Sequence, residues 1–178
     1  MPDQTRRALH LLSLSEGRPG LTPAWGTVMA EAASVCFEDQ GHGESPLLSV
    51  DGDFIEVFTV HRPSVDEQMR RSHADVDRAT ENGACGVSIL AVQALTHLTV
   101  LHQAWRGMGF DYWLGPEYGF LFQGAARLEV SGIRKGDETS IRNRVRQKLA
   151  QTERTHGVAP VYVAVVEFSR PALRIVQR

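Results

Sequence analysis

The sequence predicts an α/β fold: a mixed β-sheet with flanking helices, preceded by an N-terminal helix and β-hairpin. Apolar residues recur at helical spacing over residues 84–98, whereas residues 126–133 alternate in the manner of a strand. The run VYVAVVEFS is almost continuously apolar and β-branched, which is typical of a strand buried on both faces. Helical and strand patterns that follow one another in this way indicate helices layered on a sheet.

The chain is expected to begin with a short apolar segment and then a well-marked helix. Residues 8–14 are largely apolar but include His10 and Ser13, and we expect a short amphipathic helix or a frayed end there. Thr22 and Pro23 suit the N-cap and the first helical position, so a helix is expected over residues 23–39.

A β-hairpin and a charged helix are expected next. The segment LLSVDGDFIEVFTVHR reads as two strands around a turn at Asp51 and Gly52, a dipeptide that strongly favours hairpins. Residues 64–80 are rich in charge and are expected to follow as an exposed helix.

Residues 81–178 are expected to form the core of a single domain that spans residues 1–178, with residues 1–80 as its N-terminal extension. The elements of this core follow in the order helix, strand, strand, strand, helix, strand. Ser140 is the expected N-cap of the second helix, and PALRIVQR would end the chain as a short edge strand or a tail. In chain order the expected ranges are 84–98, 99–106, 110–114, 126–133, 140–152 and 161–169.

The composition is that of a folded globular protein. The chain has 178 residues, of which 42% are hydrophobic and 22% charged, so it can bury a core without disulfides or a structural metal. Cys36 and Cys85 are far apart and are expected to act as small buried hydrophobes. No apolar stretch approaches the length of a membrane span, and no cleavage site follows the apolar N-terminal run. A cytoplasmic location and no membrane partner are therefore expected.

Charge is unevenly distributed along the chain, whose net charge is −2. Residues 134–178 carry ten Lys and Arg against four Asp and Glu, so the excess of acid lies in the first 133 residues. This asymmetry suits either a face for an anionic partner or a solvated helix surface. Both a nucleic acid and a protein stay open as partners, and the sequence does not indicate an oligomeric state.

Two carboxylates are predicted to converge on neighbouring strands. Side chains alternate across a strand, so Asp111 shares a face with Trp113, and Glu129 shares one with Arg127 and Ser131. If the two strands pair, Asp111 and Glu129 meet at one spot and offer the oxygen ligands that Mg²⁺ or Mn²⁺ prefers. The alternative is an Asp111 that caps backbone amides and an exposed Glu129 that pairs with Arg127 or with an arginine of the following helix.

The motifs GFDYWLG and ARLEVSG, together with the order of elements around them, resemble the PD-(D/E)XK nuclease superfamily. The resemblance covers residues 81–169, roughly half of the chain. It implies a restriction-endonuclease-like core and metal-dependent hydrolysis of phosphodiesters, with Mg²⁺ or Mn²⁺ as the cofactor. It carries the family's metal-binding Asp onto Asp111 and its Glu onto Glu129. Glu81 lies near the position of an acidic residue that many members add in the first core helix.

The sequence departs from this family at its lysine, which helps to orient or polarise the attacking water. Ser131 occupies that position, two residues after Glu129, so the catalytic set of Asp111, Glu129 and Ser131 lacks an ammonium group. Some members of the family move the lysine to the next helix. Lys148, or Lys135 just after the strand, would serve in that way.

The helix expected over residues 140–152 is basic. Arg142, Arg144 and Arg146 would contact nucleic-acid phosphates beside the carboxylates, together with Lys135. A solvated helix surface is the alternative interpretation.

Two other functions stand beside the nuclease-like one. The first is a catalytically inactive relative that binds a protein or a nucleic acid, for example in a defence or toxin-related assembly. Ser131 favours it, as does the acidic stretch over residues 31–67. The second is a small-molecule-binding domain that the apolar connection over residues 115–124 would close. Zinc, serine-hydrolase and phosphate-loop chemistry are not indicated, since the histidines are scattered and no GxSxG or GxxxxGK[ST] pattern occurs.

Overall fold

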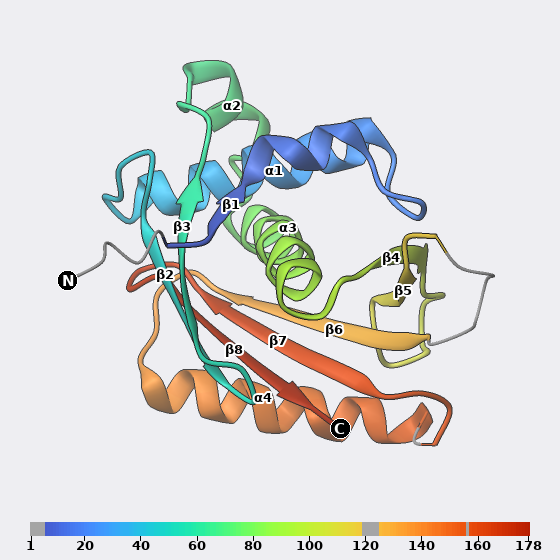
Figure 1. Ribbon diagram of the computed structural model, residues 1–178. Coiled ribbons are helices and arrows are strands. Elements are labelled where there is room, and N and C mark those ends of the chain that lie inside the picture. The colour runs from blue at the N-terminus through green and yellow to red at the C-terminus, as the bar shows by residue number, and fades with distance from the viewer. Residues whose placement is uncertain (1–5, 119–124, 156) are drawn as a thin grey trace.

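The computed structural model describes residues 6–118, 125–155 and 157–178. Within this part of the chain, eight strands form one mixed sheet with helices on both faces (Figure 1). The strands are β1 (Ala8–His10), β2 (Leu47–Gly52), β3 (Glu56–His61), β4 (Leu98–Gln103), β5 (Tyr112–Pro116), β6 (Ala126–Ile133), β7 (Val161–Glu167) and β8 (Ala172–Gln177). The helices are η1 (Leu11–Glu16), α1 (Pro23–Asp39), α2 (Glu67–Ser72), α3 (Val76–Thr96), α4 (Glu138–Thr152) and η2 (Glu153–Thr155). The predicted α/β class with a mixed sheet is confirmed.

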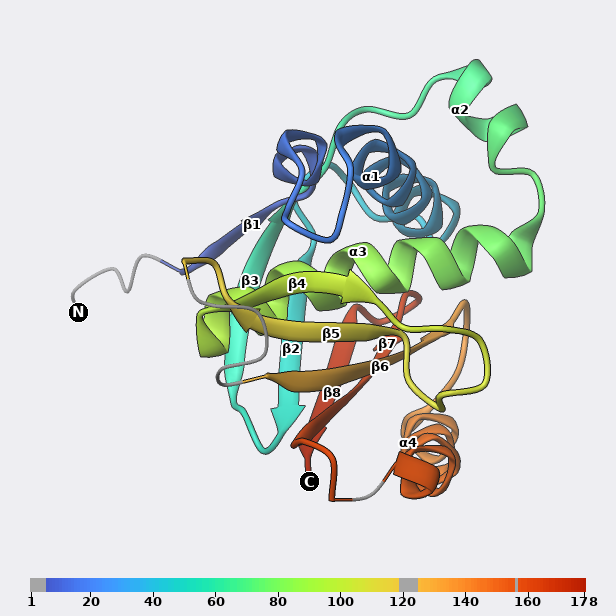
Figure 2. The same ribbon diagram turned by 90° about the vertical axis from the view of Figure 1, so that its right-hand side faces the viewer.

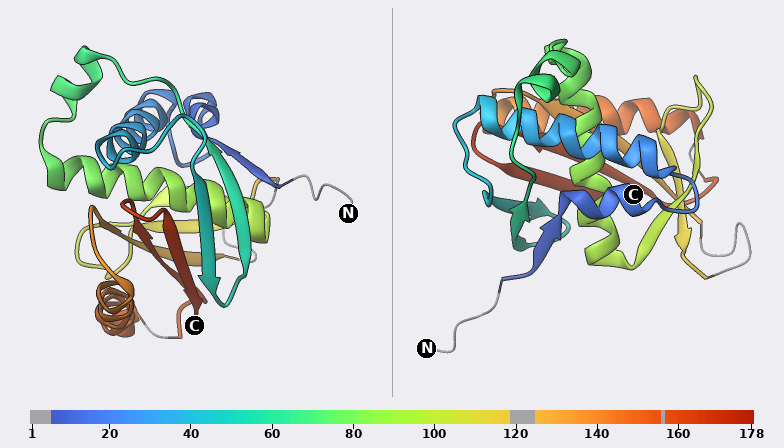
Figure 3. Two further views of the ribbon diagram at one scale, coloured as in Figure 1. Left: turned by 90° about the vertical axis from the view of Figure 1, so that its left-hand side faces the viewer. Right: turned by 90° about the horizontal axis from the view of Figure 1, so that it is seen from above.

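The strands lie in the order β1-β3-β2-β8-β7-β6-β5-β4. The meander β4-β5-β6 is antiparallel, and β7 then returns parallel to β6 after α4. On the other side, β8 pairs antiparallel with β7 and parallel with β2, which joins the N-terminal hairpin to the same sheet. Figure 3 (left) shows β2 and β3 continuing the sheet beside β8.

The sheet is covered on both faces, and each face has its own apolar core. The larger core lies between the sheet and the layer formed by η1, α1 and α3, with α3 nearest the strands (Figure 2). The smaller core lies under α4, where Ile141 and Val145 pack on Val163 and Val165 of β7. Because both faces are covered, every residue of β7 is buried, as its near-continuous apolar run predicted.

The first helix follows its sequence signals, but the segment before it does not. The helix predicted over residues 23–39 is α1, and the Thr22 hydroxyl accepts the Trp25 amide at 3.3 Å as an N-cap. The expectation of a short amphipathic helix or a frayed end over residues 8–14 is wrong for residues 8–10, which form β1 and pair with β3. From residue 11 the short 3₁₀ helix η1 follows, with Leu11 and Leu14 fully buried against α1 and α3 and Leu12 exposed.

The hairpin after α1 is confirmed, with its turn moved along the chain. The β2 strand runs through Gly52, where φ is +101°, and the turn follows it instead of lying at Asp51 and Gly52. The charged helix expected over residues 64–80 is wrong as a single element. It breaks after α2, and Asp75 then caps the start of the much longer α3.

Three further boundaries differ from expectation. The β4 and β5 strands lie at Leu98–Gln103 and Tyr112–Pro116, shifted by a few residues from the expected ranges. Ser140 is not the N-cap of α4: Asp137 is, and its carboxylate accepts the Ser140 amide at 2.7 Å. The last segment is neither an edge strand nor a tail, since β8 lies between β7 and β2 in the sheet.

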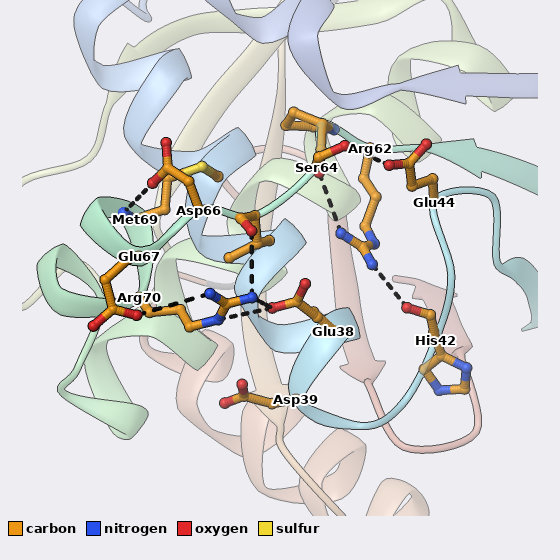
Figure 4. A network of polar contacts seen from close by, with 12 residues as sticks. Glu38, Asp39, His42, Glu44, Arg62, Ser64, Asp66, Glu67, Met69 and Arg70 are labelled. Carbon is orange, nitrogen blue, oxygen red and sulfur yellow. Dashed lines mark hydrogen bonds and ion pairs between the residues drawn. The ribbon is translucent and has the colours of Figure 1, made fainter.

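A polar network fixes the connections around β3 and α2 (Figure 4). The guanidinium of Arg62 donates to the backbone carbonyls of His42 and Gly43 at 2.8 Å each, and the hydroxyl of Ser64 donates to Glu44. Arg70 of α2 pairs with Glu38 of α1 at 3.0 Å. These contacts tie part of the acidic stretch to the fold.

Among the described residues, no helix is long and apolar enough to cross a membrane.

The contact between α3 and β6 depends on a glycine. A Cβ atom at Gly132 would lie 2.6 Å from the Thr80 carbonyl oxygen and 3.0 Å from the Ala84 Cβ. The backbone of α3 therefore approaches β6 so closely that only the hydrogen of a glycine fits at position 132. Across the helix layer, a Cβ at Gly83 would lie 2.9 Å from the Ala33 backbone, where α1 crosses α3 (Figure 3, right).

We expect Gly132→Ala to lower the free energy of unfolding by about 2 kcal/mol, because a backbone oxygen cannot rotate away from the added methyl group. Urea titration followed by circular dichroism measures this. Gly43→Ala is the matched control, since a Cβ there meets nothing within 4 Å. Equal stabilities of the two variants would contradict the account of this packing.

Candidate functional site

The two predicted carboxylates meet across the β5–β6 ladder. Tyr112 pairs with Leu128 and Trp113 with Arg127, so the next position outward sets Asp111 opposite Glu129. The Asp111 amide donates to the Leu128 carbonyl at 2.9 Å, and its carboxylate accepts the Val130 amide at 2.8 Å. The register thus brings together two acids that are far apart in the sequence.

The expected alternation of side chains along β6 is present. Leu128 and Val130 belong to the larger core beside α3. Glu129 and Ser131 point to the opposite face, where their hydrogen-bond partners come from α4. The alternative of an exposed Glu129 paired with Arg127 is wrong: Glu129 is 1% exposed, and its ion-pair partner is Lys148.

Glu129 is held from α4 by a charge-assisted contact. The Lys148 Nζ donates to Glu129 Oε1 at 2.6 Å, and Gln151 Nε2 donates to the same oxygen at 3.2 Å. The other oxygen, Oε2, is buried and has no hydrogen-bond donor among the described residues. A buried acceptor in that state is satisfied by a proton held between the two carboxyls or by a bound cation.

The electrostatics of the pair follow from this burial. Burial and, after it, the charge of Asp111 raise the pKa of Glu129 to about 7, although Lys148 opposes the shift. Burial also raises the pKa of Asp111, against the hydrogen bond from the Val130 amide. Two neighbouring buried carboxyls cannot both ionise at low cost, so the metal-free pair retains a proton close to neutral pH.

A pocket of about 840 Å³ opens beside this pair. It lies between α3 and α4, along the edge of β6 beyond the last residue that pairs with β5. Its wall brings together several of the predicted site residues, namely Glu81, Asp111, Ser131, Lys135, Arg144 and Lys148. These residues come from α3, α4, β6 and the connections that precede β5 and α4, so separate parts of the chain face one space.

The basic residues of α4 divide between two sides of the helix. Arg144 lines the pocket and donates to the Ser131 hydroxyl at 2.7 Å. Lys135 is exposed in the same wall. Arg142 and Arg146 are exposed but are not part of the pocket lining, because Ile141 and Val145 turn the helix so that these two arginines lie on its other flank.

Glu81 is placed in the pocket wall by α3, on the same side as Asp111 and Lys148. It is exposed. Within the described part of the chain, no three His, Cys, Asp or Glu side chains lie close enough together to form a metal centre on their own. Glu81 is therefore not placed to bind directly to a cation held by Asp111 and Glu129, but it can contact such a cation through water.

Sequence reasoning missed Gln151 and the surroundings of Cys85. Gln151 lies three residues after Lys148, so helical spacing was the signal that could have revealed it. Cys85 and Tyr112 both line the pocket, and burial raises the pKa of each well above its usual value, which disfavours a nucleophilic thiolate at Cys85. The connection over residues 115–124, predicted to close a pocket, lies partly outside the described residues.

The raised pKa of Glu129 makes the stability of the metal-free protein depend on pH. Between the usual value of 4.5 and about 7, the folded protein binds a proton at this site that the unfolded chain has lost, so stability falls as pH rises through this window. We expect Glu129→Gln, compared with wild type in EDTA, to stabilise the protein by about 2 kcal/mol more near pH 8 than near pH 5.

Urea unfolding at both pH values measures this difference. Glu67→Gln on the exposed α2 is the control and should show no comparable change with pH. A constant effect of Glu129→Gln across the window would mean that Glu129 is already ionised in the folded protein at low pH.

Comparison of this chain with protein-family models, with curated proteins and with solved structures found no match. No relative therefore supplies a function or a set of site residues.

Proposed function

We propose that this protein hydrolyses nucleic-acid phosphodiesters with a divalent cation, Mg²⁺ or Mn²⁺, at Asp111 and Glu129. One observation carries the proposal: the half-buried Asp111 faces the buried Glu129, with the Lys148 ammonium 2.6 Å from Glu129, beside a pocket whose wall also carries Lys135 and Arg144. Charged groups collected in this way are costly for the fold and are typical of functional sites.

The arrangement of elements around the pair supports the resemblance to PD-(D/E)XK nucleases. The elements α3, β4, β5, β6, α4 and β7 follow in the order helix, three antiparallel strands, helix and a strand parallel to the third. Asp111 precedes the second of these strands, and Glu129 lies in the third. We infer a restriction-endonuclease-like core from this combination of strand order and acid positions.

The donor set fits a hard divalent cation. Asp111 and Glu129 offer carboxylate oxygens, and Glu129 Oε2 is buried without a donor among the described residues. A cation held by these two residues would lower the pKa of a bound water and offset charge on the phosphate. Glu81, from the pocket wall, would contact it only through water.

Lys148 takes the role of the lysine that the strand lacks. Its position on α4 brings the ammonium to Glu129, whereas Ser131, in the family's lysine position, accepts a hydrogen bond from Arg144. In the reaction Lys148 would hold and orient the attacking water beside the carboxylates, and Arg144 would bind a phosphate oxygen in the pocket. Lys135 would add a second phosphate contact from the same wall. Arg142 and Arg146 would reach only phosphates outside the pocket.

A second candidate is a catalytically inactive relative that binds a protein or nucleic acid without cutting it. Ser131 in the lysine position favours this function, because the ammonium then has to come from another element. The two candidates share the pocket and its basic residues, but only the first requires turnover. Defence or toxin-related assemblies are one setting in which such a module would serve.

Loss of either carboxylate should abolish cation binding. We expect wild type to bind Mn²⁺ in calorimetry and each of Asp111→Asn and Glu129→Ala to lose this binding, because each takes away a charged oxygen ligand. Glu67→Gln removes an exposed acid on α2, far from the pocket, and should leave binding unchanged. Undiminished Mn²⁺ binding by the Asp111→Asn, Glu129→Ala double variant would refute the site.

Lys148 should matter for cleavage and not for holding the cation. We expect Lys148→Met to reduce Mn²⁺-dependent cleavage of a mixed DNA substrate at least about 100-fold, while Mn²⁺ affinity is unchanged or higher because a competing cation is gone. Single-turnover kinetics and calorimetry on the same preparation separate the two effects. Wild type that binds Mn²⁺ and DNA but cuts no strand would exclude the nuclease and favour the inactive module.

A further inference from the structure

A second hollow lies on the other side of Asp111. Its volume is about 560 Å³, and it is formed by the connection between β4 and β5 and by the end of α4. Gln103 and Asp111 line both this hollow and the larger pocket, so the two spaces meet at Asp111. Figure 2 shows the β4–β5 connection beside α4. An extended ligand bound in one of these spaces can therefore continue into the other.

Trp105 presents its indole in this second hollow. The side chain is 76% exposed, an unusual state for the largest apolar residue, and it lines the hollow together with Asp111. Arg106 and Arg154 lie in the same wall, and among the described residues neither has an ion-pair partner. An exposed aromatic surface between free cations is the combination that binds a base and its neighbouring phosphates.

The segment that carries Trp105 is anchored at both ends. The Ala104 amide donates to the Asp111 carbonyl at 2.8 Å, which closes the connection at its base. Gly109 has a φ of +81°, and a Cβ there would lie 2.6 Å from the Gln151 carbonyl oxygen on α4. Trp105 thus has a fixed relation to Asp111 and to the helix that carries Lys148.

We infer that the site takes single-stranded nucleic acid, with a phosphodiester at Asp111 and a neighbouring unpaired base stacked on Trp105. The inference rests on the proposed function and names its substrate class. In a duplex the faces of each base are covered by its neighbours, so an exposed indole can stack only on an unpaired or terminal base. The strand would run from the pocket of Arg144 and Lys135, over Asp111, to Trp105 and Arg106.

The test is fluorescence polarisation of labelled strands in EDTA, where no cleavage occurs. We expect wild type to bind oligothymidylate more tightly than an abasic strand of the same length or a long blunt-ended duplex, in which only the terminal bases have an uncovered face. Trp105→Ala should weaken oligothymidylate binding about tenfold or more and leave the abasic strand unchanged, because only a base can stack. Trp105→Phe should retain most of the affinity. Ile55→Ala, at an exposed apolar residue of the β2–β3 hairpin, is the control.

Three results would overturn the inference: equal losses of the base-bearing and abasic strands in Trp105→Ala, a duplex that binds as tightly as the single strand, or no strand binding at all. The last would assign Trp105 to contact with a protein. Mn²⁺ calorimetry on Trp105→Ala distinguishes this failure from failure of the nuclease proposal, since Trp105 offers no ligand to a cation. Intact stacking with no Mn²⁺ binding in wild type would reject the nuclease alone and leave a strand-binding site.

Discussion

The antiparallel ladder between β5 and β6 holds Asp111 opposite Glu129, and the cost of burying two neighbouring carboxyls shapes everything around them. Glu129 is almost inaccessible to solvent, and its pKa is raised to about 7 by burial and by Asp111. Lys148 and the Val130 amide offset part of this cost, but one carboxylate oxygen keeps no donor among the described residues. A fold selected for stability alone would place apolar side chains here. In the function that we propose, a bound cation offsets the rest of this cost.

The rest of the fold positions groups around that pair. The α4 helix packs Ile141 and Val145 on β7, and this orientation turns Lys148 and Arg144 toward β6. The close approach of α3 at Gly132 sets the opposite wall of the pocket. The β5 strand begins only at Tyr112, which pairs with Leu128 of β6. The part of β6 after Leu128 has no partner from β5, and the pocket lies along it. The charged groups, the pocket that gives access to them and the rigid strands that hold them thus lie together, as a preorganised site requires.

Much of this arrangement was predictable from the chain, because it depends on local patterns. The alternation of apolar and polar residues around Glu129 predicted β6 and which of its side chains face the core, and the β-branched run predicted β7 as a buried strand. Thr22 predicted the start of α1. What failed depends on tertiary contacts. The PALRIVQR segment is too short and mixed to indicate a strand between β7 and β2. The burial of Glu129 arises from α4, which covers it, and no feature of ARLEVSG reports that. The family resemblance identified Lys148 and Lys135 as candidates for the missing lysine, but the choice between them required the packing of α4 on the sheet.

The most direct test of the central claim is the crystal structure of the protein with Mn²⁺, with the ion located by its anomalous scattering. The account predicts an anomalous peak within roughly 2.3 Å of carboxylate oxygens from both Asp111 and Glu129. The same map should show the Lys148 ammonium withdrawn from Glu129 or shared with a bound water. A map with no peak at this pair, with Lys148 still bonded to Glu129 at saturating Mn²⁺, would contradict the claim that these carboxyls form a cation site.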